Sequence, residues 1–187
     1  MALSALMSCS RKAKTLMTKT GGPEMALASD NEQDFTLEIT RIFKAPRDRV
    51  FKAWSTPQHL SAWWGPKGFS LPEHDFDVVE GGAWRVVMSA PSGSQHIVSG
   101  IFKEISPTDR LVFTWGWTID GTRSHESTVT VTFEDVNVGT KVHLHQAMLT
   151  SKADRDGHQD GWNGTFDNLQ DFLDGKPREI RTADTQT

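Results

Sequence analysis

The sequence predicts an α+β fold in which a curved antiparallel sheet of about six to seven strands wraps around one long carboxyl-terminal helix. Turn signals recur about every ten to fifteen residues between positions 81 and 139, as they do in an antiparallel meander. The final segment changes period, because its apolar residues from position 158 to 173 recur at three- and four-residue spacing. A helix with one apolar stripe has to bury it, and the sheet is the only large surface that the pattern offers.

A strand and two short helices are expected first. Residues 35–43 alternate between apolar and polar side chains, which is typical of a half-buried strand. Pro46 then opens a helix at a position where its missing N–H does no harm. A second short helix is expected to begin at Pro57, and Gly65 with Pro66 ends it.

Six further strands and the long helix complete the expected order. The strands are expected at 69–77, 83–88, 95–105, 111–117, 126–133 and 140–148. Ser151 and Asp154 have the spacing of a helix start, and Gly175 followed by Pro177 is a helix stop. A helix of about twenty residues is about 30 Å long, enough to cross a whole sheet.

Alternation along the strands predicts an apolar inner face and a solvated outer face. Threonine and histidine side chains take the outer positions in the last two expected strands. Tryptophans take inner positions on the strands and on the last helix, where we expect four of them to converge. These four are Trp84, Trp115, Trp117 and Trp162.

Three glycines lie in the body of the expected last helix. Gly157, Gly161 and Gly164 each weaken a helix by about 1 kcal/mol relative to alanine, so this helix is not optimised for stability alone. Either its backbone comes close to the sheet, or room is left beside it. The tryptophans then form either a well-filled aromatic core or the lining of a cavity that holds a ligand.

The candidate ligand-binding residues belong to the inner face. They are Trp63, Trp84, Met88, Phe113, Trp115, Trp117, Gln146, His158, Trp162 and Phe166. Gln146 would orient the ligand, and His158 is either a general base or a hydrogen-bonded histidine at the rim of the cavity. His143 and His145 have a spacing that can bind zinc, but strand parity places them on the outer face. No catalytic residue, metal or other cofactor is predicted.

The ends of the chain are expected to lie outside the folded domain. Residues 1–32 are expected to be a disordered basic extension, 34–176 the domain and 177–187 a flexible tail. Residues 1–30 carry four basic and two acidic residues. The alternatives for this segment are an organelle transit peptide and a start codon assigned too early.

Net charge and cysteine content narrow the class of protein. The net charge of −4 gives no footprint for nucleic acid, and no apolar stretch is long enough to insert into a membrane. The single cysteine, Cys9, lies outside the expected domain, which leaves the domain no disulfide and fits a cytoplasmic protein. We expect a monomer or a homodimer.

Several short motifs follow one another across residues 34–176. They are Ile42–Pro46, Val50–Trp54, Trp63–Phe69, Gly81–Met88, Gly100–Ile105, Arg110–Trp115, Gly139–Val142 and Gly161–Trp162. In this order they resemble the START-like (SRPBCC) helix-grip superfamily, and within it the branch related to the carboxyl-terminal domain of the activator of Hsp90 ATPase. The resemblance implies a cavity between the curved sheet and the helix that it grips. It does not imply one function, because members include binders of lipids, hormones and polyketides as well as enzymes.

Three functions follow from the cavity and the resemblance. The leading expectation is a non-catalytic module that binds a small apolar or aromatic molecule, with its affinity supplied by burial against the tryptophans. The second is a cyclase- or dehydratase-type enzyme that uses the same cavity, with His158 and Gln146 as its inward polar groups. The third is a co-factor of an Hsp90-type chaperone or a stress-response interaction module.

Overall fold

The computed structural model describes residues 35–181, which form one seven-stranded antiparallel sheet and three helices. The strands are β1 Phe35–Phe43, β2 Ser70–Phe76, β3 Ala83–Ser89, β4 Gln95–Ser106, β5 Arg110–Ile119, β6 Thr122–Val136 and β7 Gly139–Leu149. The helices are α1 Arg47–Ser55, α2 Pro57–Trp63 and α3 Lys152–Leu173. The expected α+β fold is confirmed, and the expectation for residues 1–32 lies outside the described residues.

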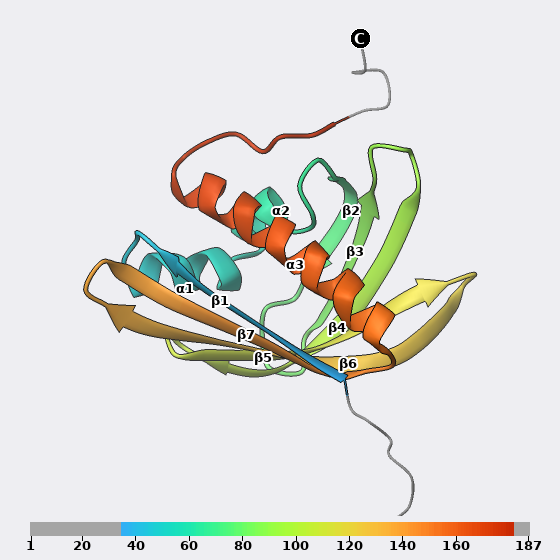
Figure 1. Cartoon of the computed structure of the whole chain (residues 1–187), viewed down its shortest axis with the longest axis horizontal. Helices are drawn as coiled ribbons and strands as arrows, with labels where there is room; N and C mark the ends of the chain where they lie inside the picture. The colour runs from blue at the N-terminus through green and yellow to red at the C-terminus, as the bar shows by residue number, and fades with distance from the viewer. Residues whose placement is uncertain (1–34, 182–187) are drawn as a thin grey trace, which may run out of the picture. The chain divides into compact units, whose positions relative to one another are not determined.

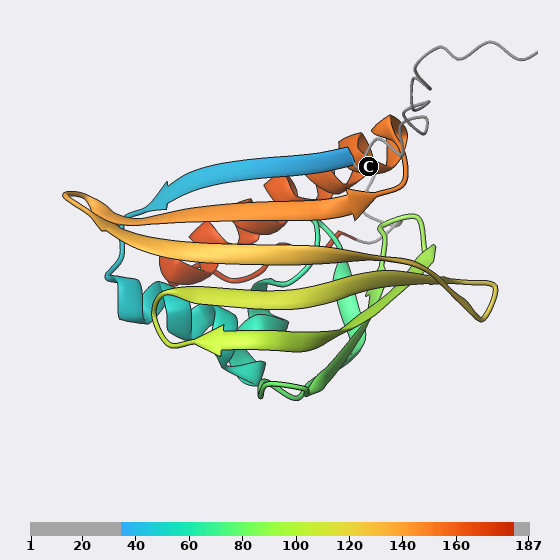
Figure 2. The ribbon, with the colours of Figure 1, turned by 90° about the horizontal axis from the view of Figure 1, so that it is seen from below.

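The sheet is curved, and α3 lies across its concave side (Figure 1). Its strand order is β1-β7-β6-β5-β4-β3-β2, so β1 pairs with the last strand along one edge. The pairing register shifts between Phe102 and Glu104 in β4 and between Gly116 and Thr118 in β5, and such bulges bend a sheet. Figure 2 views the convex side, with the helices behind the strands.

The start of α3 follows the expected capping pattern. The Ser151 hydroxyl accepts a hydrogen bond of 3.0 Å from the Asp154 N–H, which satisfies one of the free donors of the first turn. The apolar stripe of the helix is buried against the sheet, as with Trp162, Phe166 and Leu169. The long helix and its orientation therefore follow from local sequence signals.

The hairpin between β5 and β6 is longer than expected. The sequence predicts strands at 111–117 and 126–133, whereas pairing continues to Ile119 and Thr122. Asp120 and Gly121 both have positive φ, +50° and +76°. A two-residue turn with this backbone matches the twist of its strands, so the strands run on to the turn itself.

Residues 177–181 pack against the domain, where the sequence predicts a flexible tail. Ile180 forms a parallel bridge with Gly68, and the Arg181 N–H donates to the Gly68 carbonyl at 3.0 Å. In Figure 1 this red segment turns back over α2 after α3 ends. The contact joins residues far apart in the sequence, so no local pattern indicates it.

Candidate functional site

A cavity of about 180 Å³ lies between α3, the loop after α2, and strands β3 to β5. Its lining is mainly apolar and aromatic. The lining residues are Gly65, Pro66, Phe69, Met88, His96, Trp115, Trp117, Gly157, His158, Gly161, Trp162 and Thr165. The exposed residues His96 and Gly157 lie at its mouth, and the buried Met88 and Trp162 lie on its inner walls.

Two of the three α3 glycines leave open space at this cavity. A Cβ placed on Gly157 or Gly161 would meet no heavy atom within 4 Å outside the local helix. Gly164 differs, because its Cβ would lie 3.1 Å from the backbone nitrogen of Lys67. Thus both expected reasons for glycine occur in one helix, except that the close approach is to the loop after α2 and not to the sheet.

Alanine at the open positions should stabilise the protein. We expect Gly157→Ala and Gly161→Ala each to raise the free energy of unfolding by about 0.5–1 kcal/mol, since alanine favours the helix and clashes with nothing. Gly164→Ala is the matched control, and its contact with Lys67 should remove that gain. Urea unfolding of the three variants measures this, and equal effects at all three positions would contradict it.

The structure divides the predicted ligand-binding residues into two groups. Five lie on the cavity wall, namely Met88, Trp115, Trp117, His158 and Trp162. The other five do not line this cavity and are at most 2% exposed, namely Trp63, Trp84, Phe113, Gln146 and Phe166. A ligand in the cavity would touch the first group, whereas the second group forms the packed layer behind it.

Trp64, not Trp63, joins the end of α2 to the tryptophans of the sheet. The ring centroid of Trp64 lies 5.3 Å from that of Trp84 and 5.9 Å from those of Trp115 and Trp162. Trp63 instead packs behind it and donates its indole N–H to the Ala53 carbonyl at 3.0 Å. Trp63 is the residue that the sequence predicts to contact the ligand, and the structure places Trp64 beside Trp84 and Trp115 instead. Seven residues of helix do not fix which of two adjacent side chains faces the sheet.

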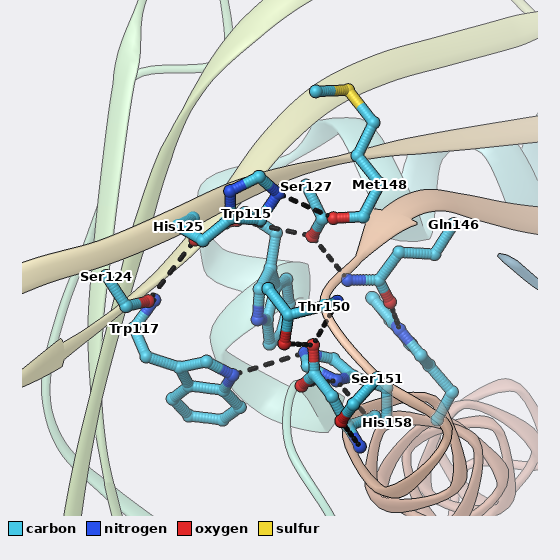
Figure 3. Close-up of polar contacts among 12 residues, drawn as sticks. Trp115, Trp117, Ser124, His125, Ser127, Gln146, Met148, Thr150, Ser151 and His158 are labelled. Carbon is cyan, nitrogen blue, oxygen red and sulfur yellow. Dashed lines mark hydrogen bonds and ion pairs between the residues drawn. The ribbon is translucent and has the colours of Figure 1, made fainter. Parts of the chain in front are cut away.

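Gln146 is fully buried and binds other parts of the protein. Its Oε1 accepts a hydrogen bond of 2.8 Å from Trp162 Nε1, and its Nε2 donates to the Ser127 hydroxyl at 2.8 Å (Figure 3). Ser127 in turn donates to the Trp115 carbonyl at 3.3 Å. Gln146 therefore fixes the Trp162 indole, a wall of the cavity, and does not present a free polar group to a ligand.

Both ring nitrogens of His158 are also engaged within the protein. Nδ1 lies 2.9 Å from the carbonyl oxygen and 3.0 Å from Oδ1 of Asp154, so it carries the proton. Nε2 is then the acceptor, and it receives the Trp117 indole N–H at 3.2 Å (Figure 3). This arrangement is that of a hydrogen-bonded histidine at the cavity rim, since a general base needs a free acceptor nitrogen.

The Trp117–His158 pair also separates the cavity from a second hollow. The second one is about 150 Å³ in volume and is lined on its far side by residues such as Ser124, His125 and Thr150. Trp115, Trp117 and His158 line both hollows. These three side chains therefore form the partition, and the Trp117–His158 hydrogen bond holds it closed.

Several wall residues were absent from the predicted set. Gly65 and Pro66 predict a helix stop and belong to the motif Trp63–Phe69, but their place at the cavity depends on how the chain folds back onto α3. His96 could have been found, since it has the strand parity of the buried Val98. Thr165 could also have been found, because it lies three residues after Trp162 on the same helical stripe.

Arg178 anchors the carboxyl-terminal segment to the loop that forms one cavity wall. Its Nε donates to the Phe69 carbonyl at 3.2 Å, and its Nη1 donates to the Ser61 carbonyl at 3.3 Å. Nη2 is buried and has no hydrogen-bond partner among the described residues. Burial lowers the pKa of the Arg178 guanidinium to about 10. Arg178 lies in the predicted flexible tail, and no local pattern indicates its contact with the loop.

The histidines with zinc-binding spacing lie on the outer face of β7, as strand parity predicts. Both are half-buried, and His143 Nδ1 forms a hydrogen bond of 3.0 Å with the Thr40 hydroxyl on β1. Within residues 35–181, no cluster of three or more His, Cys, Asp or Glu side chains is arranged to hold a metal ion. In the same part of the chain, no helix combines the length and apolar character needed to span a membrane.

A comparison with protein families agrees with the fold. The model of the activator of Hsp90 ATPase homolog 1-like proteins matches residues 44–174, most of the chain. The chain belongs to this family. The expected relationship to the START-like helix-grip superfamily is thereby confirmed. Domains with this fold commonly bind hydrophobic ligands.

Solved structures of similar proteins support the same assignment. An AHSA1 protein from Silicibacter pomeroyi is 30% identical, with a TM-score of 0.70 over 75% of this chain and 98% of its own. A protein from Rhizobium leguminosarum is also 30% identical, with a TM-score of 0.69 over 77% of this chain and 97% of its own. No curated protein matched the sequence.

Proposed function

We propose that the domain binds a small apolar or aromatic molecule in the cavity beside α3. The proposal rests on the open space at Gly157 and Gly161, which line the same cavity as Trp115 and Trp162. Alanine at these two positions would strengthen the helix, so the glycines lower the stability of the protein. A ligand-binding site explains why this space is left open.

The volume of the cavity limits the size of the ligand. An apolar cavity of about 150 Å³ is known to hold benzene, whereas sites for drug-sized molecules range from about 300 to 1,000 Å³. A cavity of about 180 Å³ therefore fits a single ring with a short substituent. A larger ligand would have to displace Trp117 from His158, which would join the cavity to its neighbour of about 150 Å³.

The aromatic wall favours a ring over a linear chain of the same area. Trp115 and Trp162 lie with their ring centroids 5.1 Å apart and an interplanar angle of 53°, and both border the cavity. A guest ring that packs on such faces gains about 0.5–1.5 kcal/mol beyond its apolar burial. We therefore expect aromatic compounds to bind more tightly than aliphatic ones of equal size.

Tryptophan fluorescence tests this proposal. We expect 3-phenylpropan-1-ol to change the emission of the wild-type protein saturably, because the ring would lie against Trp115 and Trp162. Gly161→Leu should lower the affinity at least about ten-fold by placing a side chain in the open space. Asp160→Leu, one residue away and exposed, is the matched control. No saturable change in the wild type, or equal losses in both variants, would contradict the proposal.

A further inference from the structure

Among residues 35–181, the guanidinium of Arg178 has no acidic partner. Its hydrogen bonds go to two neutral carbonyl groups, those of Phe69 and Ser61, and no carboxylate of the described residues pairs with it. The depressed pKa of Arg178 has burial as its only cause, with no acidic group offsetting it. A cation taken out of water is costly unless an anion and further hydrogen bonds compensate it.

The unpaired nitrogen of this guanidinium lies next to the cavity wall. A Cβ on Gly65 would lie 3.5 Å from Arg178 Nη2 and 3.2 Å from the sulfur of Met88. Gly65 and Met88 both line the cavity. Gly65 therefore lies between the cavity and the cation, and the side chains of Met88 and Leu71 pack closely around it, with Leu71 Cδ1 3.6 Å from the same Cβ position. The thioether of Met88 is the flexible member of this packing.

We propose that the ligand is a small organic acid, with its apolar body in the cavity and its carboxylate on Arg178 Nη2. This inference rests on the proposed function and adds the chemical class of the ligand. One free guanidinium nitrogen and one positive charge match a monoanion, and a carboxylate can reach them when Met88 changes rotamer. A phosphate ester at neutral pH would bring a second negative charge that no other described cation at this wall compensates.

The alternative is that Arg178 only fastens the carboxyl-terminal segment to the loop after α2. Such an anchor would stabilise the fold without distinguishing charged from neutral ligands. Its neighbour Arg181 offers a matched comparison, since it lies on the same segment but is exposed and paired with Glu179 at 2.8 Å. Selectivity for the acid therefore separates a binding role of Arg178 from an anchoring role.

Binding of 3-phenylpropanoate, 3-phenylpropan-1-ol and phenyl phosphate to the full chain tests the inference. We expect the acid to bind at least about ten-fold more tightly than the alcohol at pH 7, as a charge-assisted hydrogen bond would give. Arg178→Gln should reduce this ratio to about one while changing the affinity for the alcohol less than about two-fold. Arg181→Gln should leave the ratio unchanged, and Arg178→Lys should retain part of it.

The other possible results of this binding experiment contradict either the inference about Arg178 or the proposed function. An acid that binds no better than the alcohol in the wild type, or an Arg178→Gln variant with an unchanged ratio, would overturn the inference and leave the proposed function intact. Tighter binding of phenyl phosphate than of the acid would overturn the choice of a carboxylate. If none of the three compounds binds the wild type, both the inference and the proposed function fail. If the Arg178 variants do not fold, a wild-type ratio of about one still overturns the inference.

Discussion

Trp64→Ala is expected to lower the free energy of unfolding by about 3–5 kcal/mol, a large part of the total stability of a domain of this size. The ring of Trp64 is 2% exposed. It packs within 6.4 Å, centroid to centroid, of seven other aromatic rings from α1, α2, α3 and the sheet. Its removal would open a void where all of these elements meet. Urea unfolding followed by circular dichroism gives the measurement.

Trp64→Phe is the matched control for that prediction. The indole N–H of Trp64 has no hydrogen-bond partner among the described residues, so phenylalanine removes a buried donor that is unsatisfied in any case. We expect this variant to lose less than half of the stability that Trp64→Ala loses. A similar loss for both variants would show that the indole itself, and not the volume of the ring, supports the core.

Gln146→Leu should destabilise the protein by about 2–4 kcal/mol, although leucine has a similar volume and is apolar. The substitution leaves the buried Trp162 indole N–H without its acceptor and removes the amide that donates to Ser127. Trp162 is 3% exposed, so water is largely kept from replacing that acceptor. The free energy of unfolding measured in urea should show the full effect.

A double-mutant cycle with Trp162→Phe separates the hydrogen bond from the packing of Gln146. Once the indole N–H is gone, Gln146→Leu should cost about 1–2 kcal/mol less than it does in the wild type. Additive effects of the two substitutions would mean that the hydrogen bond of 2.8 Å contributes nothing to stability. In that case the account of Gln146 as the support of the Trp162 wall would be wrong.

Local periodicity predicts the order of the elements and the inward-facing residues of the strands and of α3. Strand parity placed Trp115 and Gln146 on the inner face, and helical spacing did the same for Trp162, as the structure confirms. Parity could not show that Gln146 and Trp162 bind each other, because that contact depends on the rotation of α3 against β7. A residue interpreted as a ligand contact thus became part of the support for the cavity wall.

Non-local contacts explain the parts of the site that the sequence did not reveal. The loop at Gly65 and Pro66 reaches the cavity because the Asn168 side chain on α3 donates to the Gly65 carbonyl at 2.8 Å. Arg178 reaches the same loop from beyond the end of α3. Both contacts join positions more than 100 residues apart. The sequence at 65–66 indicates a helix stop and that at 177–181 a flexible tail. Neither pattern predicts that the first segment forms a wall of the cavity or that the second packs against it.

The cavity between α3 and the sheet, lined by Trp115 and Trp162, leaves room for a guest molecule. All seven tryptophans of the chain lie in the described domain, so the indole N–H signals of a ¹H–¹⁵N spectrum report on each ring separately. Titration with 3-phenylpropanoate should shift the signals of the rings on the wall, Trp115, Trp117 and Trp162, and leave that of Trp63 in place. A spectrum in which no wall signal moves, or in which Trp63 moves most, would contradict the account.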